Sequence, residues 1–479
     1  IDSIGTNNCL GVELFGSITG SFNNPAYQWQ ISADSGLTYT NIAGANSLMA
    51  MTGALTNGRY LVRMLSAEAG NINSPNCSFI SNILKIAVSD CGTTTGIKNI
   101  INYYTPVTAF NPCDNSISVE DASGFKVGDT VLVIQMKGAV IDSSNTAAFG
   151  SVTNYRNAGN YEYNYVQSIS GNAIELKNVL QRQYDIPDGR VQLIRVPFYQ
   201  NIHVTGTLTC LPWDGRKGGV VVFNVQDSLV LDAGIDVTGM GFSGGKVTNT
   251  NLNAANCFQN EFYYPANSVL AAPKGESIAE LSVDRTSGKG RLASAGGGGL
   301  DHNSGGGGGG NASTGGIGGY PLLECSGTVF DSRGIPGNGL AYTNALNRIY
   351  LGGGGGAGHC NNGFVAPASN TNYDGGNGGG IVIINTNRLI GNNQRIISKG
   401  DSAYELNSTG GETHDGMGGG GAGGAVLINS NNITGNITID VTGGRGGDMH
   451  ATLLGGSVGP GGGGAGGVVW VNQNTVPGN

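Results

Sequence analysis

The sequence is poor in charged residues, and it has no basic run and no long hydrophobic run. Only 12% of its 479 residues are charged, about half the share of an ordinary globular chain. The net charge is −8, and without clustered Lys and Arg a nucleic-acid partner is not expected. No stretch of about 18 apolar residues predicts a membrane-spanning helix. Ile1–Ile4 lack the features of a signal peptide, so we expect a mature or internal piece of a longer precursor.

Paired metal-binding motifs are also missing. The eight cysteines include no Cys-x-x-Cys pair, so they predict no zinc site, and no cofactor is expected. An even number of widely spaced cysteines favours disulfides in an oxidising compartment, which predicts an extracellular location. The alternative is that the cysteines are reduced and buried as small apolar side chains.

The sequence offers no convincing catalytic motif. Two Gly-x-Ser-x-Gly matches, at 241–245 and 455–459, continue into glycine or loop, whereas a nucleophile elbow is followed by a helix. Glycoside cleavage needs two acids facing one cleft, and the acids of the repeats stand singly: Asp227, Asp232, Asp236, Asp401 and Asp440. Asp236 and Asp440 are expected at equivalent positions of different coils. A secreted β-helix polysaccharide lyase or hydrolase remains the enzymatic alternative.

Glycine is abundant, at 86 residues, and a glycine-led unit recurs through the second half of the chain. Four copies share a Gly-Gly entry, a short apolar strand and an asparagine: 218–224, 379–385, 423–429 and 466–472. The last three of these asparagines are 44 and 43 residues apart. A fixed period of this size predicts a solenoid in which each unit buries its apolar face on the next.

Long glycine runs interrupt the repeats, and the longest extends from Gly305 to Gly310. A flexible linker would contain serine and few apolar residues, but these runs are flanked by Leu300, Ile317 and Leu351. Glycine can form an extended helix with three residues per turn, and such helices can pack where backbones crowd. We therefore predict polyglycine II-type helices that bundle at one edge of the solenoid.

The composition divides the chain into three parts. Residues 1–90 contain short alternating strands with polar turns, which predicts a small β-sandwich. Residues 91–217 are also rich in strands and are expected to open the solenoid, which occupies residues 218–479. The predicted fold class is therefore all-β, with a sandwich followed by a parallel β-helix-like domain and its glycine insertions.

The first part resembles the immunoglobulin-like modules that occur in tandem on surface proteins of Bacteroidota. The matching pieces are Tyr27–Ser32, Tyr39–Ile42 and Asn57–Tyr60, although no Asp-x-Tyr-x-Cys precedes Cys77. With Trp29 lying between two cysteines, the resemblance favours a Cys9–Cys77 disulfide packed on the indole. The glycine-rich half is similar to glycine-rich domains of some receptor tyrosine kinase ectodomains and of certain phage tail-fibre adhesins.

These resemblances imply a non-catalytic cell-surface adhesin of the Flavobacterium-like kind, exported by the type IX secretion machinery and linked to gliding motility. Its partner would be a glycan or a ligand on a cell or solid surface. A structural role as a surface filament subunit is a further alternative, because solenoid ends expose unpaired strand edges.

Two sets of residues in the glycine-rich half are candidates for ligand contact. Aromatic side chains beside the glycine runs are expected to bind the ligand, namely Tyr320, Tyr350 and Tyr373. Four histidines lie in glycine-rich loops and would meet at a metal or ligand only if those loops project from one edge: His302, His359, His414 and His450. Their spacing matches no zinc motif, so solvated polar residues are the simpler interpretation.

Overall fold

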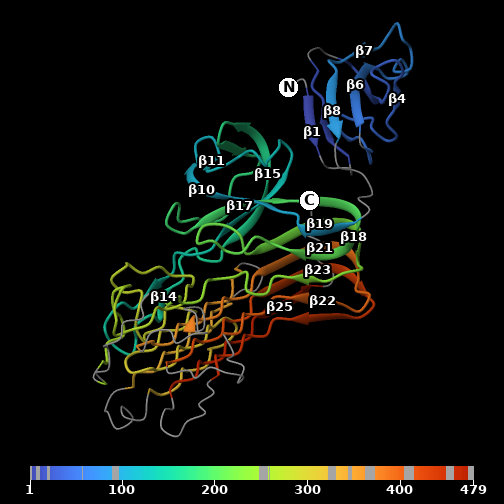
Figure 1. The fold of residues 1–479 in the computed structure, drawn as a ribbon. Helices are drawn as coiled ribbons and strands as arrows, with labels where there is room; N and C mark the ends of the chain where they lie inside the picture. Colours follow the sequence, from blue (N-terminus) through green and yellow to red (C-terminus); the bar gives the residue numbers. More distant parts are fainter. Residues whose placement is uncertain are drawn as a thin grey trace.

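The computed structural model is all-β in the part of the chain that it describes, with no α-helix there. The described residues are 3–6, 11–18, 22–56, 58–88, 96–247, 257, 259–321, 331–342, 348–361, 373–403, 415–448 and 458–472. The molecule is elongated (Figure 1), with the N-terminal module at one end, a small barrel and a stack of parallel strands in the middle, and glycine-rich chain at the other end. None of the described residues form a helix that could cross a membrane.

The N-terminal module is built on one main sheet and one strand pair. The sheet has the order β1 (Ser3–Thr6), β8 (Leu84–Val88), β6 (Gly58–Glu68), β3 (Pro25–Ser32) and β4 (Thr40–Asn41), and β7 (Phe79–Ile80) also pairs with β6. The strand pair is β2 (Glu13–Phe15) with β5 (Met49–Met51). Alternating residues of β3 and β6 bury Trp29, Val62 and Met64 against Leu14 of β2, as expected for strands with one face on a core.

The Cys9–Cys77 disulfide prediction is wrong at Cys77, which is a free, exposed cysteine. It lies in a turn between β6 and β7, where its N–H donates to Ser74 O (3.0 Å), and not beside the Trp29 indole; Cys9 lies outside the described residues. Cys257 is disulfide-bonded. Cys210 is free and buried, and burial raises the pKa of its thiol to about 12. The protein therefore contains a disulfide-bonded cysteine and also a reduced, buried one, which are the two states considered from the sequence.

A closed antiparallel barrel follows the module. Its strands run in the order β10 (Tyr103–Asn111), β11 (Ser116–Val119), β16 (Ala173–Leu176), β15 (Tyr161–Ser170), β12 (Thr130–Gln135) and β17 (Val191–Val196). The short pair β13 (Val140–Ile141) and β14 (Val152–Asn154) lies outside it. Apolar residues such as Ile117, Val131 and Leu193 fill one core of the barrel, so it is packed and not hollow.

The solenoid is a parallel sheet folded into two layers. One layer contains β19 (Val220–Leu231), β21 (Ile381–Ile390), β23 (Ala425–Thr434) and β25 (Val468–Asn472). The other contains β9 (Ile97–Ile100), β20 (Ile235–Asp236), β22 (Gln394–Ile397) and β24 (Ile437–Asp440). The long strand β18 (Phe198–Thr209) pairs with both β19 and β20 and so joins the layers. In Figure 1 the first layer descends from β19 to β25.

The strand register confirms the repeat alignment made from the sequence. Asn224 pairs with Asn385, Asn385 with Asn429, and Asn429 with Asn472. Each side-chain amide donates to the oxygen of the asparagine one coil earlier, at 2.7, 2.6 and 2.8 Å. This asparagine ladder satisfies polar groups that the sheet buries, which is the condition for keeping them inside a fold.

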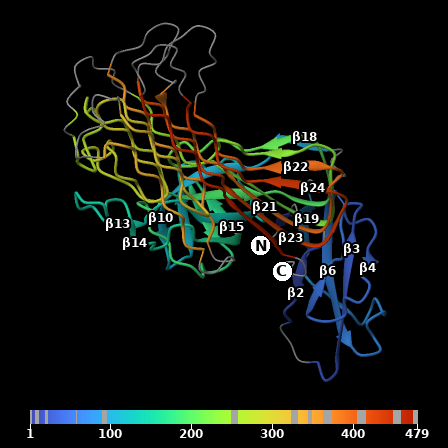
Figure 2. The same ribbon diagram turned by 90° about the horizontal axis from the view of Figure 1, so that it is seen from below.

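The glycine runs lie side by side and form what we call the glycine bundle. It contains residues 296–310, 315–319, 334–339, 352–358, 375–380, 416–424, 443–447 and 459–467. In the run 352–358, the N–H groups of residues 352, 355 and 358 donate to residues 379, 376 and 373, while those of 353 and 356 donate to 310 and 307. These bonds are 2.8–3.2 Å long. The period of three is that of an extended helix with three residues per turn, which confirms the predicted bundle (Figure 2).

The bundle requires glycine because the backbones approach too closely for a side chain. A Cβ atom on Gly296 would lie 1.9 Å from Gly307 O, and one on Gly355 would lie 2.0 Å from Gly419 O. The same spacing recurs along most of the runs, so the glycines are needed for packing and not for flexibility.

Candidate functional site

One end of the glycine bundle, which we call the bundle end, is formed by residues 358–361, 373, 415–417 and 459. Backbone bonds join these segments: Gly358 N–H donates to Tyr373 O, Gly416 N–H to His359 O, and Met417 N–H to Gly459 O, at 2.8–2.9 Å. Segments that are distant in the sequence are therefore held together there by backbone bonds. A rigid end of this kind positions whatever side chains are attached to it.

Tyr320 is the predicted aromatic contact that the structure leaves accessible. Its side chain is 63% exposed, and the Arg333 guanidinium lies 4.0 Å from the ring centroid. Arg333 also forms a two-point ion pair with Asp331, at 2.8 and 2.9 Å. The group presents an aromatic ring, a cation and a carboxylate together on the surface, which suits hydrogen bonding and stacking against a sugar.

Tyr350 and Tyr373 are not placed to contact a ligand, so that part of the prediction is corrected. Tyr350 is 1% exposed and packs edge-on against Tyr342, with ring centroids 5.2 Å apart. Tyr373 is 2% exposed, in a small cluster with Cys360 and Met417. Burial raises the pKa of the Tyr373 hydroxyl, and the nearby Asp415 adds to the effect. Both rings flank glycine runs because they fill the core beside them.

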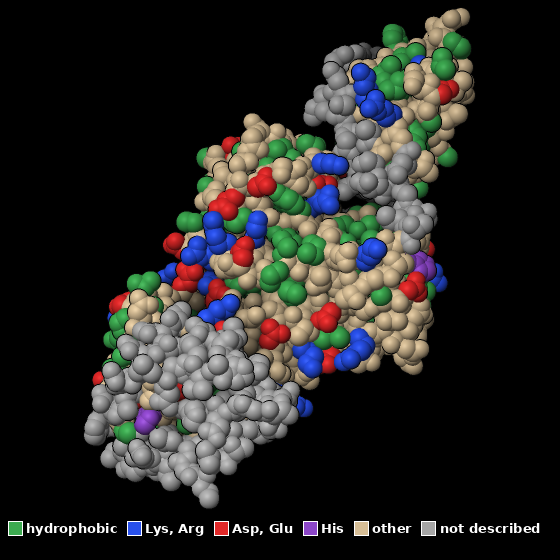
Figure 3. Space-filling view, in the orientation of Figure 1, with side chains coloured by type: hydrophobic (Ala, Val, Ile, Leu, Met, Phe, Trp, Pro, Cys, Tyr) green, Lys and Arg blue, Asp and Glu red, His purple; other side chains and the backbone are tan. Residues whose placement is uncertain are grey.

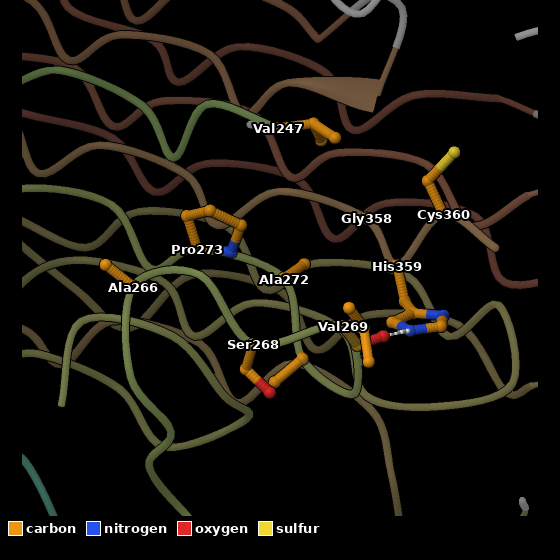
Figure 4. A pocket seen from close by; sticks show the side chains of 10 residues that line it. Val247, Ala266, Ser268, Val269, Ala272, Pro273, Gly358, His359 and Cys360 are labelled. Atoms are coloured by element: carbon orange, nitrogen blue, oxygen red, sulfur yellow. Dashed lines mark hydrogen bonds between the residues drawn. The ribbon is translucent and has the colours of Figure 1, made fainter. Parts of the chain in front are cut away.

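His359 is a buried, neutral residue of the bundle end. Its Nδ1 accepts from Asn303 N–H at 3.2 Å, so Nε2 carries the proton and donates to Val269 O at 3.1 Å. Burial lowers the pKa of the imidazole to about 4. His359 lines a hollow of about 10 Å³ with Val269 and Pro273, which is room for one water molecule and no ligand. Figure 4 shows the imidazole directed at the Val269 carbonyl.

Cys360 is the neighbour of His359 but does not form a nucleophile–base pair with it. The Cys360 thiol donates to Asp415 Oδ2 at 3.0 Å, and the Asn361 N–H donates to Asp415 Oδ1 at 2.8 Å. In Figure 4 the sulfur points away from the imidazole, both of whose nitrogens are already bonded. A nucleophilic cysteine needs a base within hydrogen-bond reach, so this arrangement ties two bundle segments together.

Two of the four predicted histidines, His302 and His359, lie in the part of the chain that the structure describes. His302 lies close enough to His359 to influence its pKa, whereas His414 and His450 lie outside the described residues. Within the described ranges, no three of His, Cys, Asp and Glu are grouped as a metal site would require.

One carboxylate pair was missed by the sequence analysis. Burial raises the pKa of Asp401, and the negative charge of Asp236 raises it further, so the two carboxyl groups lie near each other. Asn377 Nδ2 donates to Asp401 at 3.3 Å. Glycosidases also use two carboxyl groups that lie near each other, one of them with a raised pKa.

The other acids of the repeats are engaged by basic side chains. Asp440 and Asp227 form ion pairs with Arg395 at 3.0 Å and with Arg388 at 3.9 Å, and Asp232 is hydrogen-bonded to His203 Nδ1 at 2.6 Å. Asp236 and Asp440 occupy one register row, with Ile397 between them, which confirms that they are equivalent positions of different coils.

A charge cluster around the buried Lys137 joins the barrel to the solenoid and was also missed. Lys137 Nζ lies 2.7 Å from Glu276 and 3.4 Å from Glu280. Glu276 also accepts from Trp213 Nε1 at 2.9 Å, and Arg190 pairs with Glu280 at 2.9 Å. The pKa of Glu280 is lowered: burial opposes its ionisation, but Arg190 and Lys137 outweigh burial. Both carboxylates are engaged in ion pairs with Lys137, so this cluster is a structural bridge.

Acidic and basic side chains are interspersed over the face of the molecule shown in Figure 3. No protein-family model matches this chain. No curated protein matches it either.

One solved structure shows a distant likeness, the Gp54 tailspike of Acinetobacter baumannii bacteriophage AP22 in complex with A. baumannii capsular saccharide. The match covers 80% of this chain and 61% of the tailspike chain, with 12% identity and a TM-score of 0.15. A score this low carries no argument about this protein.

Proposed function

We propose that the protein is an extracellular cell-surface adhesin without catalytic activity. The observation that supports this proposal best is the glycine bundle itself, because its backbone bonds join many extended segments into one stiff support. The exposed group of Tyr320, Arg333 and Asp331 then supplies polar and aromatic contacts for a glycan. Rigid elements hold a binding site more accurately than loops on a mobile base.

The N-terminal module is proposed to be an immunoglobulin-like spacer. The Tyr60 hydroxyl donates to Thr56 O, four residues earlier, at 2.9 Å, as the tyrosine corner of such sandwiches does. Export by a type IX route and a part in gliding motility belong to the same proposal and derive from the sequence resemblance.

The binding test compares intact protein with Tyr320→Ala on an array of surface polysaccharides and on whole cells. We expect the substitution to weaken glycan binding at least tenfold, and Val283→Ala to leave it unchanged, because Val283 is 79% exposed and not part of the Tyr320 group. Antibody labelling of live source cells should show the protein on the outer surface. Equal binding by both variants, or label confined to the medium, would contradict the proposal.

A polysaccharide hydrolase is the second candidate, and the Asp401–Asp236 pair is the observation that favours it. Incubation with the polysaccharides that bind should release no shorter product if the adhesin proposal is right. Product release that disappears in Asp401→Asn would instead establish the enzyme.

A further inference from the structure

The two ends of the solenoid differ, and the first end is covered. Side chains of the barrel bond to the edge of β19: Asn102 bonds to both Val222 N and Val222 O, at 3.1 and 2.6 Å, and Tyr104 donates to Val220 O at 2.6 Å. Pro197 O accepts from Asn224 N–H at 2.9 Å. In the second layer the short strand β9 lies outside β18. Another chain therefore cannot pair with β19 at this end.

The last described coil is more exposed than the coil before it. Val426 and Ile428 of β23 are 0% exposed, but the residues paired with them in β25, Val469 and Val471, are 38% and 42% exposed. β25 pairs with β23 on one edge, and its other edge has no strand beside it in the described part of the chain. Among the described strands of the solenoid, β25 therefore has an edge that no other strand pairs with.

The glycine run 459–467, which precedes β25, is also exposed along one side. Pro460, Gly463 and Gly466 are exposed, at the three-residue spacing of the helix. Gly461, Gly464 and Gly467 donate to other runs, as do Gly462 and Ala465. Among the described residues, neither Gly463 N–H nor Gly466 N–H has an acceptor, and Pro460 has no N–H to satisfy. One side of this extended helix is therefore unpaired.

The asparagine ladder also stops here. Asn472 donates to Asn429 Oδ1, and within the described chain its own oxygen accepts no further amide. We call the exposed sides of residues 459–472 the open face; this stretch contains no charged residue. Unprotected edges of this kind pair with other chains.

We propose that the open face pairs with the open face of a second copy of this chain about a two-fold axis. At the opposite end β19 is covered by β18 and by side chains beside the barrel, so β25 cannot pair head-to-tail with β19, whereas two copies of β25 can meet. A two-fold contact makes β25 antiparallel to its copy and closes after two chains. Antiparallel pairing of glycine runs already occurs inside the bundle, where Gly461 and Gly464 donate to Gly447 and Gly444.

Sedimentation velocity of the intact protein over a concentration series tests this pairing. Wild type should reversibly form a dimer and no larger species. The double variant Gly463→Pro/Gly466→Pro removes the two unpaired N–H groups, and its rings fit the extended helix, because a Cβ at either site would have no atom closer than 3.9 Å. We expect it to weaken the dimer at least tenfold.

Val469→Lys provides an independent variant, since it adds a charge to the open face and should also weaken dimerisation at least tenfold. Val283→Lys is the matched control at a remote exposed site and should leave dimerisation unchanged. A wild type that stays monomeric, a concentration-dependent filament, or open-face variants that dimerise like the control would each overturn the proposal. This inference does not depend on the adhesin function.

Discussion

At the scale of single residues, neighbouring glycines of one run have opposite tolerance for a side chain. A Cβ on Gly464 would lie 1.9 Å from Gly421 O, whereas the nearest atom to a Cβ on Gly463 is Gly444 O at 3.9 Å. We therefore expect Gly464→Ala to lower the free energy of unfolding by about 3 kcal/mol. Gly463→Ala should change it by less than about 0.5 kcal/mol.

Denaturant unfolding at low protein concentration measures both alanine variants. If the two lose equal stability, the packing account of the bundle glycines is wrong.

His359 makes the stability depend on pH. Its pKa is about 4 in the folded protein and 6.5 in its ordinary state, so the unfolded chain binds more protons between these values. The contribution of His359 to the free energy of unfolding is fully present above pH 6.5 and decreases as the pH falls to about 4. Below that pH it is constant, and the total loss is about 3 kcal/mol. We expect His359→Gln to remove this slope.

The control for the pH measurement is His203→Gln, because His203 is exposed beside Asp232. The free energies of unfolding of wild type and of both variants are compared at pH 7 and pH 4. The difference between the two pH values should persist in His203→Gln and disappear in His359→Gln. A slope that persists in His359→Gln would assign it to other groups.

The sequence identified candidate residues but not the directions in which they point. Tyr320 and Tyr350 both flank glycine runs. Tyr350 is buried and packs on Tyr342, whereas Tyr320 is exposed to solvent. Asp401 and Asp236 belong to different coils and meet only when the coils stack. Such pairings depend on tertiary contacts that one-dimensional spacing does not contain.

At the scale of elements, the asparagine ladder locks neighbouring coils. Asn385 donates to Asn224 and to the Tyr163 hydroxyl and accepts from Asn429. Asn385→Ala should lower the free energy of unfolding by about 2 kcal/mol, because it leaves buried partners unsatisfied. Asn472→Ala, at the end of the ladder, should cost about half as much. Thermal unfolding of both variants and of the Asn385/Asn429 double variant tests the ladder, and strict additivity would argue against coupling.

Repetition made this part of the fold predictable. Four copies of one short pattern gave the register of β19, β21, β23 and β25 correctly, since stacked units repeat their contacts. The N-terminal module has no such internal copy. There the Trp29 core closes on Leu14 and Met64, while Cys77 lies in an exposed turn, so the disulfide inferred by resemblance failed.

At the scale of the whole molecule, Lys137 connects barrel and solenoid. Its side chain is 7% exposed and pairs with Glu276, and truncating one partner of a buried pair costs about 3 kcal/mol. We expect Lys137→Ala to lower the unfolding midpoint and to split the single calorimetric transition of barrel and solenoid into two, as the two parts unfold separately. Lys85→Ala, at an exposed site, is the control. One unshifted transition in Lys137→Ala would show that other contacts join the two parts.

The three-residue period of the bundle also restricts how the gene can change in length. Inserting one residue into a run such as 352–358 would rotate everything after it by a third of a turn, so each N–H would face the wrong neighbour. Inserting three residues restores the phase and only lengthens the helix by one turn. Related chains should therefore differ in these runs by multiples of three codons, while the turns between runs vary without that constraint.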